Sequence, residues 1–189
     1  MLRLIKRLFG ATNSGDEPQR ITTTDLVPDR SARAGRRRAS DAYFDTMARM
    51  QAAVSNRDFE GGARLVHENL HYIPDWVKES CSEYGSFDIS SIPALEQGGT
   101  VLALVGDDEG LARMREIVVS VPELGSWSEQ VERHQHDRRL FQAILAAIAA
   151  HPNCFQTEVK ELVGEPDGHR VANLLWYLDK AGKVVRVKA

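Results

Sequence analysis

The stretch that decides the fold lies late in the 189-residue chain, where residues 170–184 are RVANLLWYLDKAGKV. Its apolar residues recur at intervals of three and four, which places them on one side of a helix. They are Val171, Leu174, Leu175 and Leu178. Gly182 can adopt the left-handed conformation that ends many helices. Valines then alternate with Lys and Arg over residues 183–188, which predicts a short, partly exposed strand.

Two more helices are predicted just before this stretch. Residues 138–150 carry an apolar stripe filled in by alanines, and Pro152 ends that helix because proline cannot continue it. A short strand is expected over residues 154–156. Thr157 is then placed to cap a second helix that ends at Gly164. Asp167 is the expected cap of the helix that contains the opening stretch.

This order of helices, turns and a terminal strand resembles the winged helix-turn-helix domain over residues 137–189. The resemblance implies a recognition helix whose His169, Arg170 and Asn173 face the major groove, where Arg suits guanine and Asn suits adenine. Glu165 and Asp167 lie beside them and repel phosphate. The resemblance also implies contacts with the phosphate backbone. The residues expected to make them are Gln156, Thr157, Lys160, Lys183, Arg186 and Lys188.

Charge is distributed unevenly along the chain. Residues 1–40 have 9 Lys and Arg against 4 Asp and Glu, residues 41–136 have 7 against 17, and residues 137–189 have 8 against 6. An acidic middle repels nucleic acid, so contacts with DNA are expected only from the two ends. Residues 1–40 are expected to be a disordered basic leader. Its basic run at residues 33–38 either contacts DNA or an acidic partner, or only solubilises the chain.

The acidic middle, residues 41–136, contains an internal repeat. Residues 57–65, RDFEGGARL, match residues 106–114, GDDEGLARM, at five of nine positions. Each copy opens a predicted helix after a short turn, and Pro74 is expected to break the first of these helices. Paired helices with this turn resemble tetratricopeptide-type repeats, although the 49-residue spacing exceeds the roughly 34 residues of that family. Such arrays bind a protein partner or a second copy of the chain.

Little in the sequence indicates catalysis. His67, Glu68 and His71 match the HExxH pattern of zinc proteases, with a short helix and no third ligand at the expected spacing. A structural role for these residues is therefore favoured over a metal site, and no cofactor is expected. Cys81 and Cys154 are far apart, which fits reduced thiols in the cytoplasm. No stretch has the roughly 18 apolar residues of a transmembrane segment.

We therefore expect a mostly α protein with a helical-hairpin repeat region and a small C-terminal winged-helix domain with a short β wing. The function that this organisation favours is DNA-binding transcriptional regulation, with a repeat region that binds a partner or a signal. The alternative is a protein–protein interaction scaffold whose winged helix does not contact DNA. Neither hypothesis makes the chain an enzyme.

Overall fold

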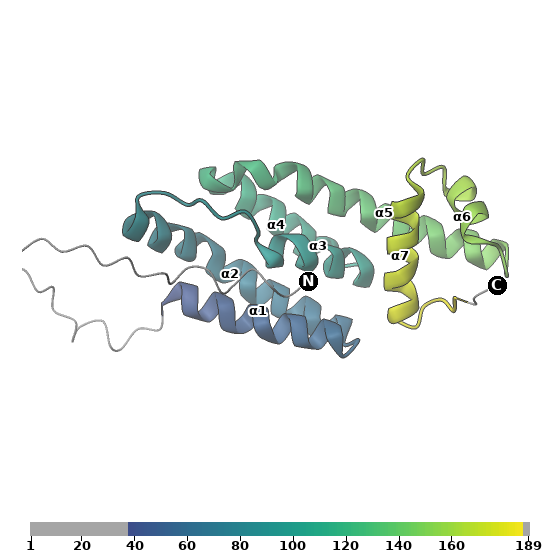
Figure 1. Ribbon diagram of the computed structural model, residues 1–189, viewed down its shortest axis with the longest axis horizontal. Coiled ribbons are helices and arrows are strands. Elements are labelled where there is room, and N and C mark those ends of the chain that lie inside the picture. Colours follow the sequence, from purple (N-terminus) through teal and green to yellow (C-terminus); the bar gives the residue numbers. More distant parts are fainter. Residues whose placement is uncertain (1–37, 187–189) are drawn as a thin grey trace, which may run out of the picture. The chain divides into compact units, whose positions relative to one another are not determined.

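The computed structural model describes residues 38–186, so the basic leader up to residue 37, and Lys188, lie outside the described residues. Helices follow one another along the described chain (Figure 1). They are α1 (Ala39–Ser55), α2 (Phe59–Tyr84), α3 (Pro93–Val105), α4 (Asp108–Ser120), the 3-10 helix η1 (Pro122–Trp127), α5 (Ser128–Ala150), α6 (Gln156–Val163) and α7 (Gly168–Lys180).

The sequence repeat is a repeated helix start. Asp58 precedes α2 and its carboxylate accepts a hydrogen bond from the amide of Gly61 at 2.8 Å. Asp107 precedes α4 and accepts from the amide of Gly110 at the same distance. These contacts satisfy amides that have no partner within the first turn of a helix. The repeated Asp and Gly therefore set the beginning of the second helix in each hairpin.

The predicted break at Pro74 is wrong, because α2 continues through Pro74 to Tyr84. Proline removes one backbone hydrogen bond and is unfavourable inside a helix. Its neighbours Ile73, Trp76 and Val77 are buried in the core. Burial of one such side chain contributes about 1.5–3 kcal/mol, so together these residues offset the local cost.

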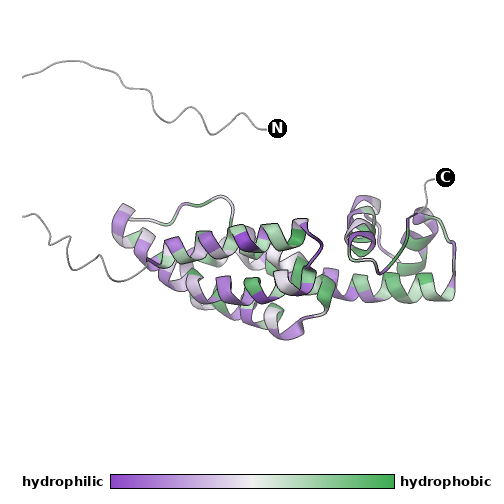
Figure 2. Ribbon diagram, turned by 90° about the horizontal axis from the view of Figure 1, so that it is seen from below, coloured by the Kyte–Doolittle hydropathy of each residue, from purple (hydrophilic) through white to green (hydrophobic). Residues whose placement is uncertain are grey.

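Two hairpins, α1–α2 and α3–α4, pack together, and α3 lies against both α2 and α5. Hydrophobic residues gather where these helices meet (Figure 2). Gly98 and Gly99 make the close approach of α3 possible. A Cβ atom at Gly98 would lie 3.0 Å from Val66 of α2, and one at Gly99 would overlap the ring of His134 in α5. The paired glycines, which are unfavourable for an isolated helix, are explained by this packing.

Helix α5 joins the hairpins to the C-terminal helices. It runs without interruption from Ser128 to Ala150, so the predicted boundary between residues 136 and 137 falls inside it. Its first half packs on α3 and α4, and α6 and α7 pack on the same helix further along (Figure 1). Residues 38–186 belong to one compact unit. The buried face of α7 is the predicted one, consisting of Val171, Leu174, Leu175 and Leu178.

The predicted β wing is wrong. Residues 38–186 contain no strand, either at residues 154–156 or at residues 183–186, so the winged-helix part of the predicted fold is corrected and the mostly α part is confirmed. The amides of Lys183 and Val184 donate back to the carbonyl of Leu178, at 2.9 and 3.4 Å. The chain therefore folds over the end of α7, and residues 38–186 provide no second strand that could pair with Val184 and Val185.

The start of α6 also differs from the expectation. Phe155, and not Thr157, occupies the capping position, and its amide donates to Glu158 at 2.6 Å. Gly164 and Gly182 adopt the expected left-handed conformation, with φ of 66° and 68°. None of the helices in the described part of the chain is both long enough and apolar enough to cross a membrane.

Candidate functional site at the α5–α7 junction

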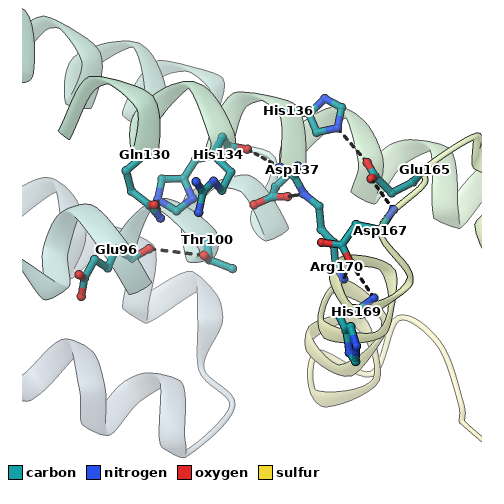
Figure 3. A network of polar contacts seen from close by, with 11 residues as sticks. Glu96, Thr100, Gln130, His134, His136, Asp137, Glu165, Asp167, His169 and Arg170 are labelled. Atoms are coloured by element: carbon teal, nitrogen blue, oxygen red, sulfur yellow. Dashed lines mark hydrogen bonds and ion pairs between the residues drawn. The ribbon is translucent and has the colours of Figure 1, made fainter. Parts of the chain in front are cut away.

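Arg170, expected to contact a base, makes an internal ion pair. Its Nε lies 2.7 Å from Oδ1 of Asp137 on α5, and its Nη2 donates to the carbonyl of Arg133 at 3.1 Å. The two side chains of the pair are only 24% and 11% exposed. Figure 3 shows Arg170 reaching from α7 across to α5. Charge-assisted bonds of this kind are among the stronger contacts in proteins, so Arg170 fixes α7 on α5.

A second polar contact, between His136 and Glu165, fixes the turn between α6 and α7. Nε2 of His136 lies 3.1 Å from Oε2 of Glu165, and the other oxygen of Glu165 accepts from the amide of Asp167 at 3.0 Å (Figure 3). The amide of Asp167, opposed by burial and helped by His136, holds the pKa of Glu165 below its usual value. Glu165 therefore stays ionised and makes the turn part of the junction. It was expected only to repel phosphate.

Asp167 caps α7 as predicted. Its Oδ1 accepts from the amides of His169 and Arg170, at 2.9 and 3.2 Å. These bonds satisfy two amides of the first helical turn. They also set the direction in which α7 leaves the turn, and hence the position of Arg170 opposite Asp137.

His134 lies buried behind the ion pair. Its Nε2 is 2.8 Å from the carbonyl oxygen of Leu95 in α3, so this nitrogen carries the proton, and Nδ1 has no hydrogen-bond partner among residues 38–186. Burial lowers the pKa of His134, although the Leu95 carbonyl and Asp137 favour the protonated form. The imidazole is thus a neutral group that joins α5 to α3.

A cleft of about 830 Å³ opens between α7 and helices α3 and α5. Helix α7 contributes His169, Asn173, Trp176 and Tyr177 to its wall, and the Arg170–Asp137 pair also lines it. Asn173 and His169 are exposed, and Trp176 remains 45% exposed. The cleft therefore offers hydrogen-bonding groups beside an aromatic surface.

The expected phosphate contacts do not lie together in this cleft. Lys183 donates to the carbonyl of Leu104 at the end of α3, at 2.9 Å, and Arg186 Nη2 donates to Gln156 at 3.4 Å. Thr157 is exposed and Lys160 is half-buried on α6. Of the residues within 38–186 that were expected to contact DNA, only His169, Arg170 and Asn173 share the cleft.

The junction includes residues that the sequence interpretation did not use. His134 and Asp137 are three apart and continue the buried spacing of Val131 and Leu140. Polar side chains at core positions need hydrogen-bonding partners. A polar residue within an apolar spacing is therefore a signal in the sequence that a buried polar contact forms there. The partners themselves, Leu95 and Arg170, are distant in the chain and become known only from the fold.

The HExxH residues belong to other contacts. His67 Nε2 lies 2.6 Å from Asp107 Oδ2, and Glu68 accepts from Thr46 at 3.3 Å. Within residues 38–186, no three His, Cys, Asp or Glu side chains are grouped so that they could hold a metal ion. Comparisons with family models, with curated proteins and with solved structures gave no match to this chain.

Proposed function

We propose that the protein is a protein-interaction module that holds a segment of a partner in the cleft beside α7. The observation that carries the proposal is the Arg170–Asp137 ion pair. In this pair the guanidinium of Arg170, which was expected to bind guanine, contacts another helix of the same chain. The groups that the cleft exposes for binding are therefore other side chains. This is the scaffold alternative given by the sequence, now with a specific surface.

The composition of the cleft supports this function. Trp, Tyr and Arg are the residue types that contribute most to binding at protein interfaces, and Trp176, Tyr177 and Arg133 line the cleft. A half-exposed Trp in a concave surface loses much of its contact with water when a partner covers it. Asn173 and His169 add hydrogen-bonding groups to the wall of the cleft.

The charge of the folded part also supports a protein partner. Residues 38–186 contain 15 Lys and Arg against 23 Asp and Glu, a difference of −8. Binding to DNA depends on neutralising phosphates, and an acidic protein repels them. Reduced Cys81 and Cys154 fit a cytoplasmic location, which we include in the proposal.

DNA binding remains the second candidate. Helix α6, a short turn and α7 follow in the order of a helix-turn-helix, and His169 and Asn173 on α7 are exposed. A binding mode without a wing would place Asn173 near the bases, where Asn suits adenine. Salt dependence separates this mode from a protein interface, because release of counterions makes DNA binding weaken steeply with salt.

The test uses a photo-crosslinking amino acid at Asn173 in the full chain. We expect crosslinks to a protein segment that recur at one position, disappear in Trp176→Ala and persist in Tyr84→Ala. Tyr84 is a suitable control because it is an exposed aromatic residue on α2, away from the cleft. Loss in both variants would contradict a specific role of the cleft.

The DNA candidate is tested in parallel by fluorescence anisotropy with a random duplex between about 50 and 200 mM salt. If the protein-interaction proposal is correct, any affinity for this DNA duplex will be the same in the unchanged chain and in Asn173→Ala. Affinity that falls steeply with salt and is lost in Asn173→Ala would replace the protein-interaction proposal with the regulator.

A further inference from the structure

A second concave surface, which we call the C-terminal groove, lies at the far end of α5. It has a volume of about 600 Å³. Ile148 of α5, Leu175 of α7 and Phe155 before α6 form its apolar lining, together with Val185 of the segment after α7. This groove and the α7 cleft have no lining residue in common.

The groove exposes apolar side chains to water. Phe155 is 65% exposed and Val185 is 86% exposed. Each square ångström of apolar surface removed from water stabilises a complex by about 25 cal/mol. Covering these residues therefore favours binding. Single exposed apolar residues are common on proteins, whereas these two line the same concavity.

The charged residues of the groove are all cationic. Lys183 and Arg186 line it, and no Asp or Glu of residues 38–186 does. This sign is opposite to the excess of Asp and Glu over residues 38–186 as a whole. Lys183 is directed to the carbonyl of Leu104. Among residues 38–186, the side chain of Arg186 has one hydrogen bond, to Gln156 at 3.4 Å, and its backbone amide donates to Asp179. The guanidinium of Arg186 therefore keeps donors for a carboxylate.

We infer that the C-terminal groove binds a segment of a partner protein that carries apolar side chains flanked by Asp or Glu. The apolar side chains cover Phe155 and Val185, and a carboxylate of the segment pairs with Arg186. The inference goes beyond the proposed function, since it assigns a second binding surface with its own chemistry. With both surfaces occupied, the chain connects two partners.

The groove contains its own reporter for occupancy. Cys154 lies in the lining as a free thiol, and Cys81 is a free thiol on α2, outside the groove. A bound segment slows alkylation of Cys154 by N-ethylmaleimide and leaves Cys81 unchanged. Peptide mapping by mass spectrometry measures both rates in the same sample.

The probes are three fluorescent 16-residue peptides. The first has Leu and Phe at helical spacing with Glu beside them, the second has Lys for each Glu, and the third has Ser for each Leu and Phe. We expect only the first to bind the full chain and to protect Cys154. Equal binding of the Lys peptide would overturn the assigned charge, and binding of the Ser peptide would overturn the apolar contact.

The variants are chosen to leave the fold intact. Phe155→Ser removes the exposed ring and places a favourable capping residue at the start of α6. We expect it, and Val185→Ser, each to weaken the first peptide about tenfold, the loss typical of an interface anchor. Val119→Ser is the matched control, because Val119 is 73% exposed on α4.

Arg186→Gln should weaken the same peptide several-fold, and Arg64→Gln, an equal change of charge at an exposed site of α2, should not. Absence of binding by all three peptides, with Cys154 unprotected, would overturn the inference. So would a Val185-dependent self-association seen by sedimentation, or binding to anionic lipid vesicles in place of the peptide. None of these results depends on occupancy of the α7 cleft.

Discussion

At the scale of single residues, the function that we propose depends on whether Arg170 is paired inside the chain or faces solvent. Its side chain is three-quarters covered and its partner Asp137 is covered further, so the pair is shielded from water. Removing one member of a buried pair leaves the other charge without compensation. The same guanidinium would be much less costly to remove if it faced solvent, as the sequence interpretation required.

We therefore expect Arg170→Met to lower the free energy of unfolding by about 3 kcal/mol. The double variant Arg170→Met/Asp137→Leu should recover most of this loss, because no isolated charge remains. Urea unfolding followed by circular dichroism measures both. Arg133→Met is the control, since Arg133 pairs with the exposed Glu129 and should change stability by about 0.5 kcal/mol or less. Equal losses in Arg170→Met and Arg133→Met would contradict the buried pair.

At the scale of an element, the start of α1 depends on a side chain from α2. The carboxylate of Glu79 accepts from the amides of Ala39 and Ser40, at 3.0 and 3.1 Å. Burial works to raise the pKa of Glu79, but these amides and the nearby Arg38 outweigh it and hold the pKa below its usual value. A carboxylate whose pKa is lowered by folding stabilises the fold above its unfolded pKa, and this contribution is lost as the pH falls through the folded pKa.

Glu79→Ala should therefore speed hydrogen exchange at the amides of Ala39 and Ser40 near pH 7. The difference from the unchanged chain should shrink as the pH falls through the lowered pKa of Glu79, because the carboxyl then becomes protonated. Nuclear magnetic resonance of the exchanging amides measures this. Glu83→Ala serves as the control, because among residues 38–186 Glu83 contacts only the exposed side chain of Arg38. A similar effect of both changes would contradict the capping role of Glu79.

At the scale of the whole molecule, α7 is connected to several other helices. Beyond the pair with α5, its Tyr177 ring lies 6.5 Å from that of Phe59 in α2. The segment after it bonds through Lys183 to the carbonyl of Leu104 in α3. Connections to three helices, and a continuous α5, should make residues 38–186 unfold together.

We expect one cooperative transition, seen with 5-fluorotryptophan in place of all three tryptophans. Trp76 in α2, Trp127 in η1 and Trp176 in α7 then give separate fluorine resonances in one sample. Their native signals should disappear at the same urea concentration. Earlier loss of the Trp176 signal would show that the C-terminal helices unfold independently, as the predicted boundary at residue 137 implies.

The sequence by itself determined most of the helices. Their apolar spacing, the caps Asp58, Asp107 and Asp167, and the glycines that end them are local properties of the chain. A local pattern states which residues form one face of a helix, and for α7 the predicted face is the buried one. The sequence also indicated candidate binding residues that share the cleft, since His169, Arg170 and Asn173 lie there.

Only the tertiary structure decided how these helices are used. Alternating valines after Gly182 have the pattern of a strand, but a strand needs a neighbour, and the chain there folds back on Leu178. Pro74 is tolerated because its neighbours are buried by distant helices. The partner of Arg170 lies 33 residues away, and the local spacing of residues does not indicate that this contact forms or how stable it is. Local periodicity therefore fixed the elements, and long-range pairing fixed the surfaces on which we base the function.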